Sequence, residues 1–333
     1  MRWISIVALS LGTAASGPVA ASPAPAPPAD PATDTFWRDV VEPHGATVAA
    51  IVARAKNAIG KAVAAADDDS IGRRARYLGD AYGMLRYAHK LSPQNTEVLS
   101  LLGVTADDLG KTRQALDALE TCARLQGPEH TGPEVAGRLG MIYLRLGKLD
   151  AAIHWLRQVQ APLATTDSAM TVVHLATALA ARGEMAQAID VLTSTLPAQI
   201  NYFTDPVTIV SFALAVHYDR DEQRAAALDV IDRMSGNLQH ELGPFLQRAL
   251  AALRFAPAED ELYYHALLYE SLGHDAEARA EWALYASVMD APWRRRALDH
   301  ITAIDARRAA SGAHPTARGG AAHRVQPHHP LVP

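Results

Sequence analysis

Two glycines interrupt the segment "LGMIYLRLGKLDAAIHWL", residues 139–156, in which almost every other residue favours a helix. Gly140 and Gly147 lie seven residues apart. Because a glycine inside a helix costs about 1 kcal/mol relative to alanine, each position is expected to have a structural reason. We expect Gly140 to lie where two helices cross closely, beside Ala152. We expect Gly147 to form the turn between them, where a positive φ is cheap only for glycine.

The same arrangement recurs along the chain. Segments that superimpose on this one start near residues 96, 169 and 259, and residues 76–95 supply mainly the second half of a further unit. A weaker unit covers residues 205–234. Matched alanines recur at spacings of 34, 37 and 36 residues, at Ala81, Ala115, Ala152 and Ala188. Apolar residues at helical spacing, without a convincing alternating pattern, predict an all-α protein built from repeats.

This pattern resembles the tetratricopeptide repeat family, whose units read W-x2-L-G-x2-Y, a turn, and then A-x3-F. Leu139-Gly140 with Tyr143 matches the first helix, Gly147 the turn, and Ala152 with Leu156 the second helix. The resemblance covers about residues 62–290. It implies a right-handed α-solenoid of about five helical hairpins within residues 36–310, with flanking helices that include an alanine-rich one around residues 46–66.

The N-terminus has the order of a secretory signal peptide over residues 1–21. Arg2 is followed by the apolar run Ile4–Leu11 and by small residues that end at Ala21, where cleavage is expected. The apolar run is too short to span a bilayer. We therefore predict an exported protein, periplasmic or secreted, with no transmembrane segment in the mature chain.

Two further segments have little to bury. Residues 22–35 form a Pro/Ala-rich linker, and residues 311–333 form a His/Pro/Gly-rich tail that is expected to be disordered. Cys122 is the only cysteine and therefore cannot form an internal disulfide. It lies in a helical pattern, so we expect a buried small side chain there rather than a reactive thiol.

The sequence offers no convincing catalytic or metal motif. Gly110-Lys111-Thr112 resembles the end of a phosphate-binding loop but lacks the earlier glycine and the preceding strand. His240 to Pro244 begins like a zinc motif but has proline in place of the second histidine. A formal net charge of −5 gives no indication of nucleic-acid binding. We expect neither an enzyme nor a cofactor or metal site.

The resemblance implies a concave groove lined by one stripe of each first helix, which would bind a peptide or protein segment. Lysine and asparagine are absent from this stripe, so we predict no clamp for a terminal carboxylate. The stripe suits an amphipathic helix or an apolar peptide, and its two aromatic residues are the expected anchors. The alternative is that several of these side chains pack against neighbouring repeats. The predicted groove residues are Val104, Met141, Val173, Thr177, Phe212, Val216 and Tyr263.

These observations together predict an exported binding or scaffold protein. The alternative is a structural or assembly subunit of an envelope or secretion complex that uses its ends and its convex face. The basic segment 292–308 is interpreted as a polar cap on the last repeat, because terminal repeats need a polar outer face. A peripheral contact with an anionic surface of the envelope is the other interpretation of that segment.

Overall fold

The computed structural model describes residues 44–65, 71–159, 163–197, 200, 203–238, 242–251 and 255–310. Within these residues the chain consists of helices and their connections, without a strand. The predicted all-α solenoid is confirmed. The predicted signal peptide, the linker and the C-terminal tail lie outside the described residues.

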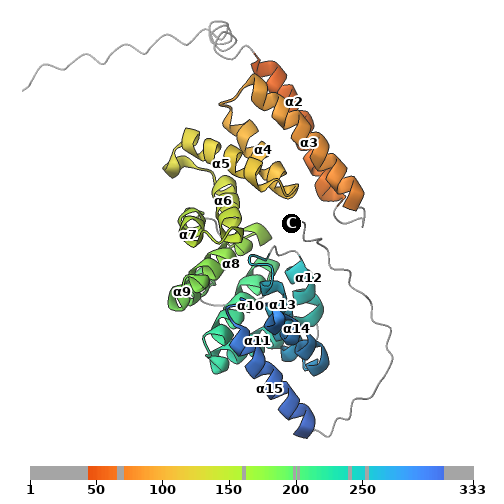
Figure 1. Ribbon diagram of the computed structural model, residues 1–333, viewed down its shortest axis with the longest axis vertical. Coiled ribbons are helices and arrows are strands. Elements are labelled where there is room, and N and C mark those ends of the chain that lie inside the picture. The colour runs from red at the N-terminus through yellow and green to blue at the C-terminus, as the bar shows by residue number, and fades with distance from the viewer. Residues whose placement is uncertain are drawn as a thin grey trace, which may run out of the picture.

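Most of the described helices pair into successive antiparallel hairpins. Figure 1 shows the α2–α3 hairpin at one end of the molecule and α15 at the other. A short 3-10 turn at Pro128–His130 precedes the third hairpin. The hairpins are α2 (Gly45–Ala64) with α3 (Ile71–Leu91), α4 (Thr96–Asp108) with α5 (Thr112–Gln126), α6 (Pro133–Arg145) with α7 (Leu149–Arg157), α8 (Thr166–Ala181) with α9 (Met185–Thr195), α10 (Asp205–Arg220) with α11 (Arg224–Leu238), and α13 (Asp260–Ser271) with α14 (Asp275–Ser287).

Two helices stand outside this pairing. The sequence patterns did not predict α12 (Leu242–Ala251), which lies between the last two hairpins. The final helix, α15 (Arg294–Ala310), packs against α14 and corresponds to the predicted basic segment. The alanine-rich helix expected around residues 46–66 is α2, which forms the first hairpin together with α3.

The helices of a hairpin cross closely at the predicted glycine. A Cβ atom added to Gly140 would lie 2.4 Å from Cγ of Leu156 and 3.3 Å from the carbonyl oxygen of Ala152. Gly103 in α4 has the same relationship to Leu119 of α5. The close-crossing prediction is therefore confirmed, since even a methyl group at these positions would collide with the second helix. The later hairpins carry buried alanine at the matching position.

The turns of the hairpins share one geometry. Gly147 has φ +68°, and the N–H groups of Gly147 and Lys148 donate to the carbonyls of Leu144 and Tyr143, both at 2.9 Å. Gly110, Gly183 and Gly273 occupy the same position with φ between +71° and +89°. These paired bonds satisfy carbonyls at the helix C-terminus. The predicted role of glycine in the turn is confirmed.

The weaker unit predicted over residues 205–234 forms the α10–α11 hairpin, which is a repeat of the same kind. Its turn places Glu222 at φ 59° where the other hairpins have glycine, and the N–H groups of Glu222 and Gln223 donate to the carbonyls of Asp219 and Tyr218. Ala227 and Ile231 of α11 are buried at the positions that match Ala152 and Leu156. The motif was hard to detect because the turn lacks its glycine, not because the hairpin is absent.

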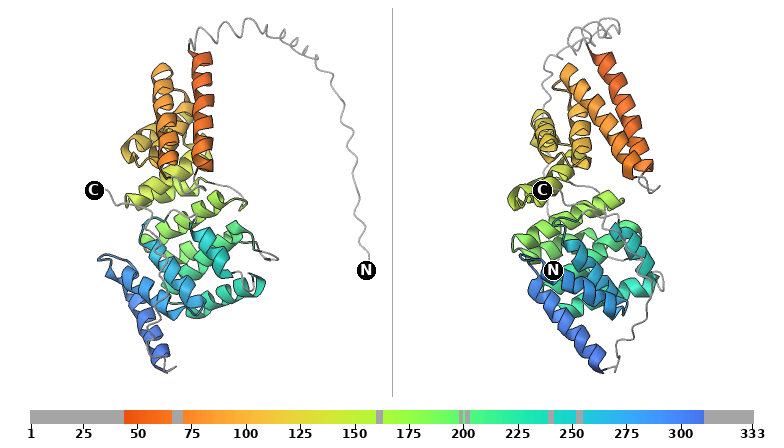
Figure 2. Two further views of the ribbon diagram at one scale, coloured as in Figure 1. Left: turned by 90° about the vertical axis from the view of Figure 1, so that its right-hand side faces the viewer. Right: turned by 45° about the vertical axis from the view of Figure 1, so that its right-hand side comes forward.

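The second half of the molecule is thicker than the first. Figures 1 and 2 show α10 enclosed in the lower part of the molecule, where α12, α13 and α14 gather beside it. In α10, from Pro206 to His217, every residue is buried. An amphipathic surface helix would expose one face, so a further layer must cover α10. The α12–α13 region supplies that layer through its contacts with α10.

Candidate binding surface and its C-terminal cover

A groove opens between the first helices of two consecutive hairpins, α6 and α8. Its volume is about 550 Å³. Met141 lines it together with Gly137, where an added Cβ would make only ordinary contacts, 3.6 Å from Oγ1 of Thr171 and 3.8 Å from Cγ2 of Val159. The groove floor therefore has space that glycine leaves open. Further lining residues are Pro133, Glu134, Arg138, Thr165, Asp167, Ser168 and Met170.

The rim of this groove is polar and held in place by local hydrogen bonds. Thr165 caps α8, because its side chain accepts the N–H of Ser168 at 3.2 Å, while Ser168 Oγ accepts the N–H of Thr165 at 3.1 Å. Arg138 on α6 pairs with Asp107 at 3.0 Å and with Asp108 at 3.1 Å. Arg145 also contacts the buried carboxylate of Asp107. These ion pairs fix α6, which forms one wall of the groove, against α4.

The seven predicted groove residues divide into an open and a covered set. Val104 and Met141 are partly exposed on α4 and α6. Val173 and Thr177 on α8 are each 5% exposed, and the remaining three, on α10 and α13, are at most 1% exposed: Phe212, Val216 and Tyr263. The expectation that the two aromatic residues are exposed anchors is wrong. These side chains belong to the core, as the alternative interpretation of the stripe anticipated.

The cover over this part of the stripe comes from the segment that follows α12 and from the start of α13. The ring of Tyr264 lies 5.9 Å from the ring of Phe212 and 5.1 Å from that of Phe255, both edge to face. A cavity of only about 10 Å³ separates Phe255 and Tyr264 from Val173 and Thr177 on α8. The C-terminal part of the chain therefore occupies the concave side of α8 and α10, where a partner was expected to bind.

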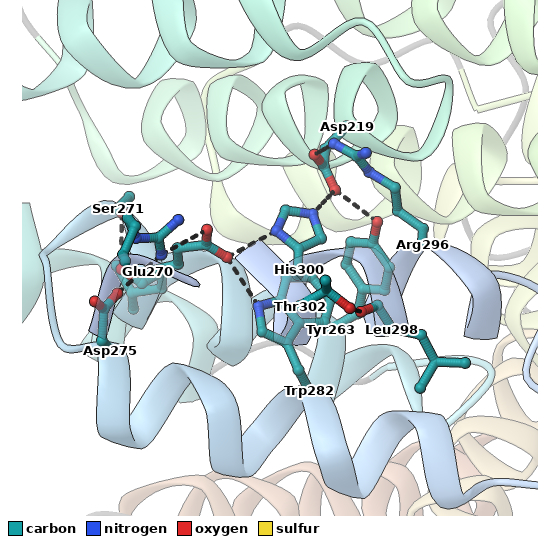
Figure 3. Close-up of polar contacts among 12 residues, drawn as sticks. Asp219, Tyr263, Glu270, Ser271, Asp275, Trp282, Arg296, Leu298, His300 and Thr302 are labelled. Carbon is teal, nitrogen blue, oxygen red and sulfur yellow. Dashed lines mark hydrogen bonds and ion pairs between the residues drawn. The ribbon is translucent and has the colours of Figure 1, made fainter. Parts of the chain in front are cut away.

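A network of buried polar side chains holds this cover to the C-terminal end of α10 (Figure 3). Oδ2 of Asp219 accepts the hydroxyl of Tyr263 at 2.7 Å and lies 2.9 Å from Nε2 of His300. Oδ1 of Asp219 accepts from Arg296 at 2.6 Å. One carboxylate on α10 thus binds α13 and, through two side chains, α15. Next to it, Arg220 pairs with both oxygens of Asp260 on α13, at 2.7 and 3.3 Å, with both partners buried.

The other side of the His300 imidazole faces Glu270. Nδ1 of His300 lies 2.7 Å from Oε2 of Glu270, and the indole of Trp282 donates to the same oxygen at 3.0 Å. Arg307 contacts Glu270 at 3.1 Å and Asp275 at 2.9 Å. The basic side chains Arg296 and Arg307 of the 292–308 segment therefore pair with the protein itself. This supports the interpretation of the segment as a cap.

The charges of the network shift the pKa of each member. Burial alone would lower the pKa of His300, but hydrogen bonds and charge from Asp219 and Glu270 raise it above its ordinary value. Burial alone would raise the pKa of Asp219 and of Glu270, and the hydrogen bonds from His300 lower both instead. With acidic oxygens at both ring nitrogens, the arrangement favours the imidazolium form of His300, in which both nitrogens donate.

Sequence reasoning missed this network. The signal was the spacing of Ala297, His300 and Ile304, which places one side of the basic helix in the core. His300 on that side needs buried partners, and a carboxylate at the end of an otherwise apolar helix, such as Asp219, is a candidate for one.

The structure also locates two of the other motifs noted in the sequence. Gly110-Lys111-Thr112 lies in the turn between α4 and α5, as expected. Cys122 is buried with its Sγ 3.3 Å from the carbonyl of Thr96, and burial raises the pKa of its thiol, so the expectation of an inert side chain agrees with the structure. His240 lies outside the described residues.

Two kinds of feature, a metal-binding cluster and a membrane-spanning helix, are absent from the described part of the chain. Its His, Cys, Asp and Glu side chains include no group of three that could hold a metal ion. None of its helices is long and apolar enough to cross a membrane.

The chain was compared with known families and structures. A family model described as Tetratricopeptide repeat matches residues 133–161, a range that includes the α6–α7 hairpin. No curated protein sequence matches the chain.

Several solved structures are similar. MamA is 23% identical over 51% of this chain and 96% of its own, with a TM-score of 0.42. PilW, a type IV pilus biogenesis factor, is 14% identical over 73% of this chain and 98% of its own, with a TM-score of 0.44. PilF of Pseudomonas aeruginosa is 10% identical over 78% of this chain and 99% of its own, with a TM-score of 0.46.

Proposed function

We propose that the chain, a tetratricopeptide repeat protein, is an exported scaffold that binds a segment of a partner protein in the α6–α8 groove. The observation that carries this proposal is the contrast within the concave surface. The α6–α8 part is open, with about 550 Å³ of space, while the stripe on α10 is covered by the chain's own C-terminal part. Binding is therefore assigned to Met141 and Gly137, which line the groove, not to Phe212 or Tyr263.

The chemistry of the groove supports an extended or helical peptide with small apolar side chains. Met141 and Met170 offer adaptable apolar contacts, and thioether side chains suit surfaces that accept varied partners. The rim supplies charges of both signs through Glu134, Asp167 and the ion-paired Arg138. Apolar contacts at the centre and polar groups at the edge are the usual arrangement of a protein interface.

Export is the second part of the proposal. It is supported by the order of Arg2, the apolar run Ile4–Leu11 and the small residues that end at Ala21. Mass measurement of the protein isolated from its native cell tests it. A mature chain that starts at Ser22 is the expected result, and an intact chain recovered from the cytosol would contradict it.

Photo-cross-linking tests the groove. A cross-linking amino acid at Met141 is expected to capture one partner in cells, whereas the same amino acid at Leu125, which is exposed on α5, is not. Affinity for the purified partner is then compared in two variants. Gly137→Trp fills the groove and should weaken binding at least about tenfold, while Arg157→Ala, outside the groove, should leave it unchanged. If Gly137→Trp binds normally, the structural-subunit alternative, which uses the ends and the convex face, is favoured.

A further inference from the structure

A second cavity lies among α9, α10 and α11, apart from the α6–α8 groove. Its volume is about 320 Å³. The second helices of two consecutive hairpins, α9 and α11, form part of its walls, so it does not belong to the concave surface described above. Its apolar lining includes Leu196, Phe203, Leu214, Val230 and Met234. A pocket of this size lies at the lower end of the range that small ligands occupy.

A buried polar group in this cavity, the hydroxyl of Ser211, has no partner among the described residues. Ser211 lines the cavity from α10, is 2% exposed, and its hydroxyl makes no hydrogen bond to any residue that the structure describes. Other hydroxyls on the same helix find one, since Oγ1 of Thr208 donates to the carbonyl of Thr204 at 2.9 Å. Buried polar groups in native proteins are nearly always paired, so an unpaired hydroxyl that lines a cavity indicates a missing partner.

The wall also carries a positive charge on its solvent side. Arg233 of α11 lines the cavity, yet its side chain is 63% exposed, which places its charged end near the opening. It pairs with Asp229 at 2.9 Å, and that carboxylate is 68% exposed. An exposed pair of this kind contributes little to stability, so a ligand anion can share the guanidinium at small cost.

We propose that this cavity binds a medium-chain carboxylate. The alkyl chain packs against the apolar lining, the carboxylate accepts a hydrogen bond from the Ser211 hydroxyl, and Arg233 selects the anionic head over a neutral or cationic one. This site is independent of partner binding at the α6–α8 groove.

Calorimetric titration of the full chain with decanoate, decanol and decyltrimethylammonium tests the site. Decanoate is expected to bind most tightly and decyltrimethylammonium most weakly. Ser211→Ala should weaken decanoate about three- to tenfold, the value of one hydrogen bond. Arg233→Gln should weaken decanoate but not decanol. Ser211→Leu fills the cavity and should abolish binding of all three, while Met141→Glu in the groove should change nothing.

The melting temperature separates a binding role of Ser211 from a structural one. Because the hydroxyl has no partner among the residues that the structure describes, Ser211→Ala should melt no lower than the parent chain. A lower melting temperature for Ser211→Ala would mean that water already satisfies the hydroxyl, and would overturn the proposal. Absence of decanoate binding at millimolar concentration, or binding that both Ser211 variants retain unchanged, would overturn it as well.

Discussion

The imidazole of His300 lies nearly parallel to the indole of Trp282, with ring centroids 4.3 Å apart and an interplanar angle of 11°. Both rings point a nitrogen at the same oxygen of Glu270. The stacking therefore places α14 and α15 side by side, and the shared carboxylate joins them to α13. Since the second nitrogen of His300 lies within hydrogen-bond distance of Asp219 on α10, one imidazole ring connects four helices.

The first prediction is that stability falls as the pH rises above about 6.5. The pKa of His300 is raised by Asp219 and Glu270, so its contribution is complete below the unfolded-state value of about 6.5 and is lost as pH rises through the folded-state value. Arg296 and Arg307, which share these carboxylates, remain charged throughout this range. Urea unfolding at several pH values from 6.5 to 9 measures the slope.

His300→Gln is the matched control and should flatten that slope. Two other histidines, the buried His217 and the partly buried His265, do not contribute to the slope in the upper part of this range. Burial lowers the pKa of His217 to about 3 and lowers that of His265, so both are neutral in the folded and unfolded states once the pH is about one unit above 6.5. They destabilise the fold only at lower pH, where the unfolded chain takes up their protons. An equal slope in the parent chain and in His300→Gln would show that His300 is not protonated in the fold.

The second prediction compares two glycines of α6. Gly140→Ala should destabilise the protein by about 1–3 kcal/mol, because the new methyl group collides with Leu156 and approaches the backbone of Ala152. Gly137→Ala should stabilise it by about 0.5–1 kcal/mol, since its methyl group makes ordinary contacts and alanine favours helix. Chemical denaturation measures both. Effects of the same sign would contradict the close crossing at Gly140.

The third prediction concerns the turn of the α10–α11 hairpin. Glu222→Gly should raise the free energy of unfolding by about 1 kcal/mol, because φ 59° strains a residue that has a Cβ atom. Asp221→Gly is the neighbouring control, with an ordinary φ of −86°, and should not stabilise. If both substitutions lower stability, the Glu222 side chain has a role that the turn geometry does not reveal.

The fourth prediction follows from the burial of Phe212 and Tyr263. Each substitution by alanine should cost about 3–5 kcal/mol, as expected for large aromatic residues in a core. Val104→Ala, at a partly exposed site, should cost clearly less. Thermal unfolding of the three variants measures the difference. If Phe212→Ala melts at the same temperature as the parent chain, Phe212 is not part of the core.

The repeat itself could be predicted from the sequence because its determinants are local. Gly140, Ala152 and Gly147 lie within a dozen residues of one another and dictate one hairpin. The cover over the concave stripe could not be predicted in this way. It depends on contacts such as those of Asp219 with Arg296 and His300, which lie 77 and 81 residues after Asp219 in the sequence. A periodic pattern identifies which residues face inward, but not which distant segment they face.

The long-range contacts of the C-terminal cover also change how the molecule is expected to unfold. In a simple solenoid each repeat contacts only its neighbours, so end repeats can fray independently. The hairpins from α2 to α7 fit that description, since their contacts are with adjacent hairpins. From α10 to α15, the Asp219 carboxylate joins helices from three successive parts of the chain. That half is expected to unfold as one cooperative unit, while the hairpins from α2 to α7, which include one wall of the open groove, can unfold one at a time.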